Sequence, residues 1–379
     1  KIVLNEQYEF LKSTVKEEIN DNLIDLTFDI GESEKFYVEK INILGNNITR
    51  EEVIRNNLLV DEGDAFNELL QAKTLNNLKA LNFFSKVESE ITDSIKENKK
   101  IINIIVEEKP TGEIMAGAGV GTNGGTVAFG VSENNFLGRG IEFASDLTIS
   151  GESLKGLISL NNPNYKGSNR SLNASLESSV TDQLQKFGYK STKTGFSLGS
   201  GFEIYDDLFW NTGISSYIEK LDTDSAVSSN IKKQEGTYFD TFFNQVFFYD
   251  KRNQRFKTSD GYFSRFNQNI PLISENYTLT NGYDYKIYDE WLDENIFSFG
   301  LFLKASNSIN GKDIKLSERL FVPSNKLRGF EIGKVGPKDG TDYIGGNYAA
   351  SINMATTLPK ILPNLQNTSL SIFVDAANI

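Results

Sequence analysis

The feature that most constrains this fold is an alternation of apolar and polar residues that recurs in run after run beyond Pro110. In Ile141–Ser150 the odd positions are mostly apolar and the even positions mostly polar, and Ser171–Val180 and Lys193–Ile204 show the same period. Side chains of a strand point alternately to two faces, so each run predicts a strand with one apolar and one polar face.

These runs are also unusually long. Strands of globular proteins usually have about five or six residues, whereas these runs reach ten or more. A transmembrane barrel needs such strands, with lipid against the apolar face and a polar lumen inside. Trp210, Tyr249, Tyr262, Tyr288 and Trp291 lie near the expected strand ends, where interfacial aromatic girdles form.

We therefore predict that residues 110–379 form an antiparallel transmembrane β-barrel. About thirteen strands precede Ile379, and bacterial barrels have even strand numbers, so we expect an incomplete barrel of about sixteen that lacks its final strands. A soluble β-sandwich also alternates and is the structural alternative. No run approaches the ~20 apolar residues of a membrane helix.

The composition excludes several kinds of chemistry. The chain has no His and no Cys, which removes His-containing triads, thiol nucleophiles and His or Cys metal sites. Its net charge of −12 argues against a nucleic-acid partner. No phosphate-binding or nucleophile-elbow motif appears. We predict no enzyme activity, no cofactor and no metal site.

Residues 33–109 have the order strand, helix, helix, strand, strand, which predicts a small α+β domain. Thr49 and Glu52 form a capping-box pattern before the first helix, with Ile48 and Val53 placed as a hydrophobic staple. Asp64 is the expected N-cap of the second helix. Residues 1–32 have the pattern of a hairpin, and we expect this hairpin to be the C-terminal part of a preceding domain of the same kind.

Two further stretches suggest function. The first barrel strand, 112–122, contains Gly117, Gly119 and Gly121, which indicate either barrel curvature or a weakly paired seam. A long connection between the strands expected at 296–307 and 346–358 contains Leu327-Arg328-Gly329-Phe330. Connections of this length are often functional. Arg supplies a fork of donors, Gly a tight backbone path and Phe a packing anchor. A surface Arg in a turn is the simpler interpretation.

The domain at 33–109 resembles a POTRA domain. The resemblance depends on glycines at turns and apolar residues of the core: Gly45, Gly63, Phe66, Leu78, Leu81, Phe83, Phe84 and Val87. It implies that an exposed strand edge pairs with an extended client. The edge expected to do so contains Lys86, Val87, Glu88 and Ser89.

The whole chain resembles the BamA family of outer-membrane assembly factors, which combine POTRA domains with a transmembrane barrel. The matching motifs are Leu327–Phe330 followed by Gly333 and Gly336-Pro337, Gly345-Gly346-Asn347, Asp250-Lys251-Arg252 through Gly261-Tyr262, and Phe373-Val374-Asp375-Ala376. The resemblance implies that the loop folds into the lumen and that Arg328 meets Asp375. Many relatives have a Glu near the position of Ala355, so Arg328 is expected to have one acidic partner here.

The resemblance implies a function in the bacterial outer membrane, with the N-terminal part in the periplasm. The protein would insert β-barrel proteins into the membrane: POTRA edges guide clients and a lateral seam templates their strands. Its partners would be unfolded outer-membrane proteins, periplasmic chaperones, assembly lipoproteins and the lipid bilayer. A POTRA-barrel transporter that exports polypeptides, of the two-partner secretion or translocation-assembly type, is the alternative, and a passive porin is less consistent with residues 33–109.

Overall fold

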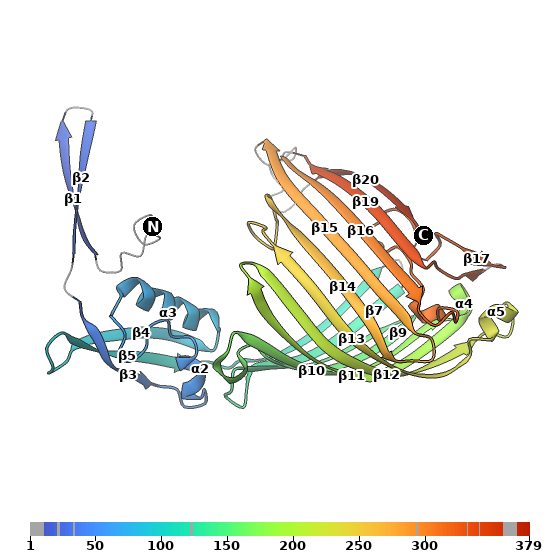
Figure 1. Ribbon diagram of the computed structural model, residues 1–379, viewed down its shortest axis with the longest axis horizontal. Helices are drawn as coiled ribbons and strands as arrows, with labels where there is room; N and C mark the ends of the chain where they lie inside the picture. The colour runs from blue at the N-terminus through green and yellow to red at the C-terminus, as the bar shows by residue number, and fades with distance from the viewer. Residues whose placement is uncertain are drawn as a thin grey trace. The chain divides into compact units, whose positions relative to one another are not determined.

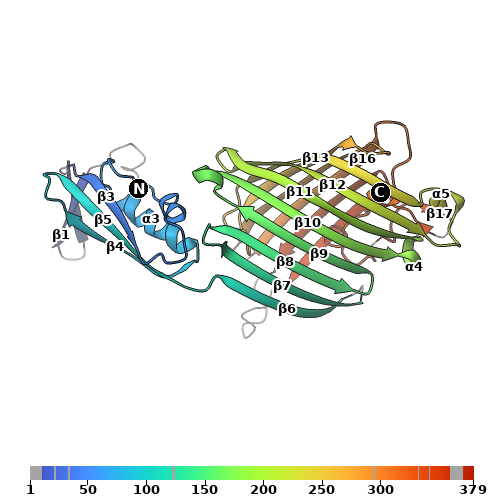
Figure 2. The same ribbon diagram turned by 90° about the horizontal axis from the view of Figure 1, so that it is seen from below.

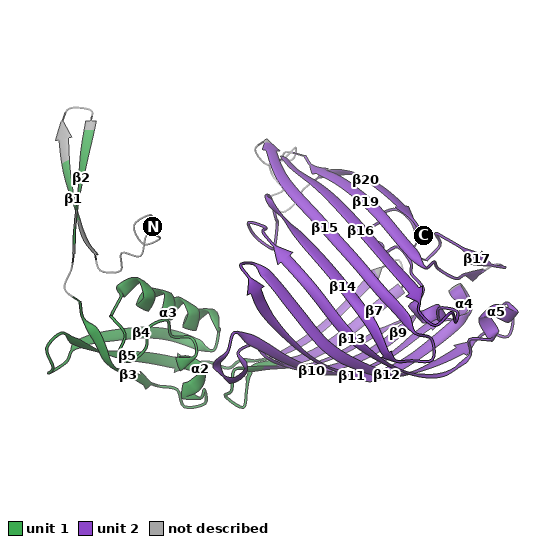
Figure 3. Ribbon diagram, in the orientation of Figure 1, with its two compact units in different colours: residues 1–112, 133–141 green, residues 113–132, 142–379 purple. Residues whose placement is uncertain are grey.

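The computed structural model describes residues 11–20, 23–32, 35–121, 124–292, 295–331, 333–340, 342–358 and 370–379. The chain forms two compact units (Figure 3). Unit 1 is Lys1–Gly112 with Glu133–Ile141, and unit 2 is Glu113–Ser132 with Glu142–Ile379. None of the helices in the described ranges has the length and apolar character needed to cross a bilayer.

Unit 1 contains the predicted small α+β fold. Its strands β3 (Tyr37–Leu44), β4 (Phe84–Asp93) and β5 (Lys99–Glu108) form a sheet in the order β3-β5-β4. The helices α2 (Glu51–Arg55) and α3 (Glu68–Ala80) complete the core. That core buries Ile54, Leu78 and Ile102 completely, as the apolar spacing of the sequence requires. A separate hairpin consists of β1 (Leu11–Asn20) and β2 (Leu23–Glu32).

Both predicted helix starts are wrong. The N-cap of α2 is Arg50, without a side-chain cap, and the Thr49 hydroxyl accepts a hydrogen bond from Asn135 instead. The residue before it, Ile48, is exposed, so no hydrophobic staple forms. The second helix is capped by Asn67, whose side chain accepts from two backbone N–H groups, while Asp64 accepts from the backbone of Asp61. In each case the side chain that the sequence pattern assigns to the helix cap instead accepts a hydrogen bond in a tertiary contact or a turn.

A carboxylate from β5 fixes the turn after β3. Glu108 accepts hydrogen bonds from the backbone N–H groups of Asn47 and Ile48 at 2.9 Å and of Thr49 at 2.6 Å. Partial burial favours the neutral acid, but the hydrogen bonds from Thr49 and its two neighbours outweigh it and lower the pKa of Glu108. Gly45 begins this turn with φ +92°, and a Cβ there would lie 2.0 Å from the Val106 carbonyl oxygen.

Unit 2 is dominated by a single antiparallel sheet of 13 strands (Figures 1 and 2). Its order is β20-β19-β16-β15-β14-β13-β12-β11-β10-β9-β8-β7-β6, so neighbours in the sequence are neighbours in the sheet. The strands are β6 (Gly112–Gly121), β7 (Gly124–Phe136), β8 (Ile141–Ser150), β9 (Ser153–Asn162), β10 (Arg170–Gln183), β11 (Tyr189–Tyr205), β12 (Leu208–Thr223), β13 (Gly236–Asp250), β14 (Gly261–Ile273), β15 (Thr278–Leu292), β16 (Asn295–Ser308), β19 (Tyr348–Thr357) and β20 (Ser371–Asn378).

The strand number confirms the prediction of about thirteen. In the described residues the sheet is not closed, because β6 and β20 each pair with one neighbour. The connections differ in length: the turn between β8 and β9 is short, and the connection between β16 and β19 is the longest.

The two faces of the sheet differ as the alternation predicts. One face carries Asp240, Asp284 and Asp375, which contact the connection between β16 and β19; we call it the inward face. The opposite, outward face exposes large apolar side chains on successive strands, among them Ile158, Leu176, Leu198, Ile214, Ile352 and Val374. Such an outward surface is stable against lipid rather than water.

Aromatic rings cluster on the outward face near strand ends. The ring of Trp210 stacks on Phe247 at 5.8 Å, and that of Tyr249 lies 5.9 Å from Tyr262. The prediction for Tyr288 is wrong. Tyr288 shares the inward face of β15 with Asp284, which contacts the loop, because residues an even number apart in a strand share a face.

Candidate functional site: the loop between β16 and β19

The connection between β16 and β19, residues 309–347, lies against the inward face of the sheet (Figure 1). It contains the short helix η2 (Leu316–Glu318) and the two-residue strands β17 (Lys338–Asp339) and β18 (Asp342–Tyr343). We call this segment the inner loop. A bridge between Leu320 and Gly346 draws its two ends together. The described residues of the inner loop are therefore part of the fold of unit 2.

The structure brings Arg328 and Asp375 together. The Arg328 guanidinium donates from Nε to one carboxylate oxygen at 2.7 Å and from a terminal nitrogen to the other at 2.6 Å. The backbone N–H of Arg328 donates to the same carboxylate at 2.9 Å. Its guanidinium also lies over the ring of Phe373, 3.7 Å from the centroid. The Asp375 side chain is only 3% exposed, so a bidentate partner is needed to compensate its burial.

A second residue of the wall orients Asp375. Asn353 lies directly opposite Asp375 in the pairing of β19 with β20. Its amide nitrogen donates to the Asp375 carboxylate and to the Lys326 carbonyl oxygen, each at 2.8 Å. The Lys326 ammonium in turn pairs with Asp284 on β15 at 2.6 Å. Through Lys326 and Arg328 the inner loop is thus joined to three neighbouring strands, β15, β19 and β20.

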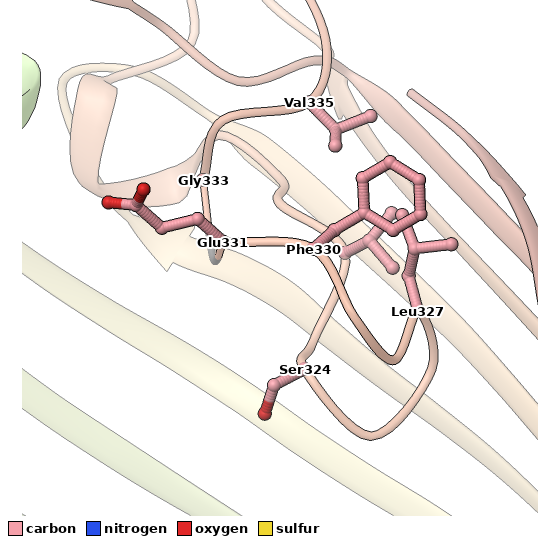
Figure 4. A pocket seen from close by; sticks show the side chains of 7 residues that line it. Ser324, Leu327, Phe330, Glu331, Gly333 and Val335 are labelled. Carbon is pink, nitrogen blue, oxygen red and sulfur yellow. The ribbon is translucent and has the colours of Figure 1, made fainter. Parts of the chain in front are cut away.

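The other residues of the predicted motif have different environments. Leu327 is buried, and Gly329 has φ +84°, a conformation that disfavours any side chain. Phe330 is 61% exposed, so its assignment as a packing anchor is wrong; Leu327 fills that role. Phe330 borders a small hollow within the loop, shown in Figure 4. Its lining residues are Val322, Ser324, Leu327, Phe330, Glu331, Gly333 and Val335.

Lys315 makes a further anchor at the start of the loop. Its side chain is 1% exposed and its ammonium contacts Asp240, Glu219 at 3.2 Å and Glu318 at 3.4 Å. Burial alone favours the neutral amine, but Glu318 and the two wall carboxylates outweigh it and raise the pKa of Lys315. The four side chains border a cavity of about 210 Å³ on the inward face.

An apolar cluster supports the same end of the loop. It combines buried side chains from strand ends and connections, namely Phe187, Tyr189, Leu221, Ile231 and Leu316. Two of these residues belong to one-turn helices, α4 (Leu184–Phe187) and α5 (Ser229–Lys232). The ring of Phe187 stacks on Phe321 of the inner loop at 5.1 Å. The loop is thus held by a polar anchor and an apolar one.

The other predicted site residues lie at sheet edges. The strand β6 ends the large sheet, and a Cβ at Gly117 or Gly119 would meet no atom within 4 Å. Steric crowding therefore does not require these glycines. Gly121 is the last residue of β6.

The expected client edge, β4, is indeed at an edge of the small sheet. Lys86 and Glu88 point to solvent and pair with each other at 2.9 Å, while Val87 is buried in the core. Ser89 lies opposite Ile104 of β5, the neighbouring strand in the small sheet.

Sequence reasoning did not find Asn353 or Lys315. Asn353 occupies a polar position of an alternating strand, which is the only signal it gives. Lys315 lies before the recognised motif, and its partners Glu219 and Asp240 come from strands far away in the sequence.

The comparisons with known proteins agree with this geometry. The family model described as an Omp85 superfamily domain matches residues 135–379. The chain belongs to the Omp85 superfamily. A second model, described as a surface antigen variable number repeat and named POTRA, matches residues 36–109. The α+β domain followed by a large antiparallel sheet is thus the arrangement expected of an Omp85 protein, which confirms the predicted fold class.

Individual relatives of this Omp85 chain are named as assembly factors. The outer membrane protein assembly factor BamA of Neorickettsia risticii is 26% identical over 95% of this chain and 50% of its own length. The same-named protein of Nitratidesulfovibrio vulgaris is 24% identical over 91% and 44%. This chain spans about half the length of the curated relatives that it matches.

Solved structures show the same fold. BamA from Haemophilus ducreyi lacking POTRA domains 1–3 superposes with a TM-score of 0.83 and 20% identity, over 100% of this chain and 81% of that one. CdiB from Acinetobacter baumannii superposes less well, with a TM-score of 0.51 and 12% identity, over 99% and 69%.

Proposed function

We propose that this chain belongs to a factor that assembles β-barrel proteins into the bacterial outer membrane. The observation that supports this most is the similarity, along 95% of the chain, to a protein named as an outer membrane protein assembly factor. The apolar outward face suits the lipid bilayer, and the domain at 36–109 would lie in the periplasm.

In this function the protein acts by binding and templating, without a catalytic residue. Unfolded outer-membrane proteins, delivered by periplasmic chaperones, would pair with the edge at Lys86–Ser89 by strand addition. Assembly lipoproteins would bind the periplasmic arm. The client then adds strands at the β6 edge, where glycines at 117, 119 and 121 weaken pairing. Folding in lipid is itself favourable, so the factor lowers a kinetic barrier.

The inner loop would keep the wall in shape while the seam opens. Three hydrogen bonds from Arg328 to Asp375 join the loop to β20, the strand at the opposite edge of the sheet from β6. A loop fixed to the last described strand can hold that region rigid while the first strand exchanges partners. The proposed role of Leu327–Phe330 is therefore to brace the wall, with Arg328 as the contacting group.

The test uses the full-length protein reconstituted in liposomes. A urea-unfolded barrel client is added, and its folding is followed by gel shift with wild type, Arg328→Ala and Lys334→Ala. Lys334 pairs with Glu331 in the same loop but is exposed, so its replacement is the matched control. We expect faster client folding with wild type and Lys334→Ala than in empty liposomes, and a loss of most of this gain in Arg328→Ala.

Folding no faster than in empty liposomes, with a well-folded protein, would contradict assembly. It would favour the alternative, a polypeptide exporter of the same architecture. Transport of an unfolded polypeptide into sealed liposomes would then be measured.

A further inference from the structure

A buried cluster of charged groups surrounds the start of the inner loop. Lys315 of the loop, Glu219 of β12 and Asp240 of β13 have side chains that are 1%, 4% and 4% exposed. Glu318 of η2, 17% exposed, adds a third carboxylate. Lys193 of β11 lies directly opposite Glu219 and adds a second ammonium. All five side chains border the cavity of about 210 Å³. Two ammonium groups thus face three carboxylates, which leaves one negative charge in excess.

Two of the three carboxylates are well supported by donors. Glu219 accepts hydrogen bonds from the Ser191 hydroxyl at 2.6 Å and from a second serine hydroxyl at 3.0 Å, in addition to the Lys315 ammonium. Asp240 accepts from the Ser274 hydroxyl at 2.6 Å and from Lys315. The ionised forms of both groups are therefore compensated despite their burial.

Glu318 has the weakest support. One of its oxygens lies 3.4 Å from the Lys315 ammonium, longer than the roughly 2.7–2.9 Å of a charge-assisted hydrogen bond. The other, Oε2, is buried and has no hydrogen-bond partner in the described part of the chain. The neighbouring strands supply only hydroxyls: Thr278 of β15 contacts the side chain, and Ser306 of β16 donates to the Glu318 carbonyl oxygen. The next residue, Arg319, does not border the cavity. Burial therefore raises the pKa of Glu318, and Lys315 and Thr278 oppose this effect without outweighing it.

We infer that Glu318 binds a proton near neutral pH and that this proton fastens the start of the inner loop to the wall. With Glu318 protonated, two carboxylates face two ammonium groups and the charges of the cluster balance. When the proton leaves, an ionised oxygen without a donor remains buried, which is costly. Movement of Glu318 into water removes that cost, so the start of the loop is released. The inference goes beyond the proposed function and does not depend on client assembly.

The direction of the pH effect follows from linkage between proton binding and loop position. The fastened loop holds the proton more tightly than the released loop, in which Glu318 is in water. The contribution of Glu318 to fastening is therefore complete below the ordinary pKa of a glutamate and is lost as the pH rises through the raised pKa of the fastened state.

The first test measures hydrogen exchange of residues 314–322 in the full-length protein, with each rate divided by the intrinsic rate at the same pH. For wild type we expect protection about tenfold lower at about pH 8.5 than at about pH 5.5. Glu318→Gln keeps the shape and stays neutral, so its protection should remain high throughout. Glu331→Gln, which changes an exposed carboxylate of the same loop, should follow wild type. A flat wild-type profile, or an equal slope in Glu318→Gln, would overturn the inference.

A second pair of variants tests the charge balance with Glu318 intact. Ser179 lies opposite Lys193 in the pairing of β10 with β11 and also borders the cavity. Ser179→Lys brings a third ammonium that takes the place of the proton, so protection of residues 314–322 should no longer depend on pH. Ser179→Met places an uncharged chain there and should keep the wild-type slope. Loss of the slope in both variants, or in neither, would contradict the proton as the missing charge. Client folding, measured separately, tests the proposed function independently.

Discussion

Asp375 accepts three hydrogen bonds from a single residue, Arg328: two from its guanidinium and one from its backbone N–H. The backbone bond ties the position of the loop main chain to the carboxylate, in addition to the ion pair. The site therefore recognises the geometry of the loop as well as its charge.

The first prediction is that charge alone cannot replace this pair. Arg328→Lys keeps the charge but loses the fork of donors, and we expect it to weaken the loop anchor by about 2 kcal/mol. The exchange Arg328→Asp with Asp375→Arg should recover little, because the backbone N–H then has no acceptor. Limited proteolysis of the inner loop in detergent measures the effect. Wild-type cleavage rates in the exchange variant would contradict it.

How much of this site can be predicted from the sequence depends on how many residues separate the two partners of each contact along the chain. Alternation fixes which face each strand residue occupies, so the strands and both faces are predictable; β8 is found at its predicted bounds. Arg328 and Asp375 are predictable together only through the family resemblance, since 47 residues separate them. The prediction that Tyr288 belongs to the aromatic girdle is wrong because proximity to a strand end does not determine on which face of the sheet a side chain lies.

Helix starts were less predictable for a physical reason. Thr49 followed by Glu52 satisfies the local capping pattern, but Glu108 and Asn135 bind the Thr49 backbone and hydroxyl from distant parts of the chain. A local sequence pattern holds no information about such tertiary partners, which compete with the helix cap for the same polar groups. The same argument explains why Lys315 was missed: its partners lie on β12 and β13, and only the folded sheet brings them beside the loop.

The second prediction concerns Asn353. Replacing it with Asp places a second carboxylate against Asp375, within hydrogen-bond distance of the present amide. Like charges at this distance repel, so we expect the loop to become more sensitive to protease at neutral pH and to recover at acid pH. Asn307→Asp, at a side chain that accepts an exposed hydrogen bond from Tyr348, is the control and should change little. Hydrogen exchange of residues 326–330 would report the change.

The third prediction concerns Lys315. Lys315→Met leaves Glu219 and Asp240 buried without their cation, which costs about 3–5 kcal/mol when one partner of a buried pair is removed. We expect a lower temperature for the heat-induced gel shift of the folded protein. The triple variant with Glu219→Gln and Asp240→Asn removes the unpaired charges and should recover much of the loss. No recovery in the triple variant would show that packing, not charge, holds this anchor.

The fourth prediction is a pH dependence in the small domain. Because hydrogen bonds lower the pKa of Glu108 in the folded state, its contribution to stability is complete above the pKa of the unfolded chain. That contribution is lost as the pH falls through the lowered folded pKa. We expect the amides of Asn47, Ile48 and Thr49 to be protected from exchange at neutral pH and to lose protection in acid.

Variants isolate the carboxylate in that measurement. Glu108→Gln keeps an acceptor oxygen but removes the charge, so it should reduce protection at neutral pH by about 1–2 kcal/mol and remove the pH dependence in the same turn. Glu107→Gln changes an exposed neighbour and should leave both unchanged. An identical pH profile in Glu108→Gln and wild type would mean that the turn after β3 is held by Gly45 and the backbone bonds rather than by the Glu108 carboxylate.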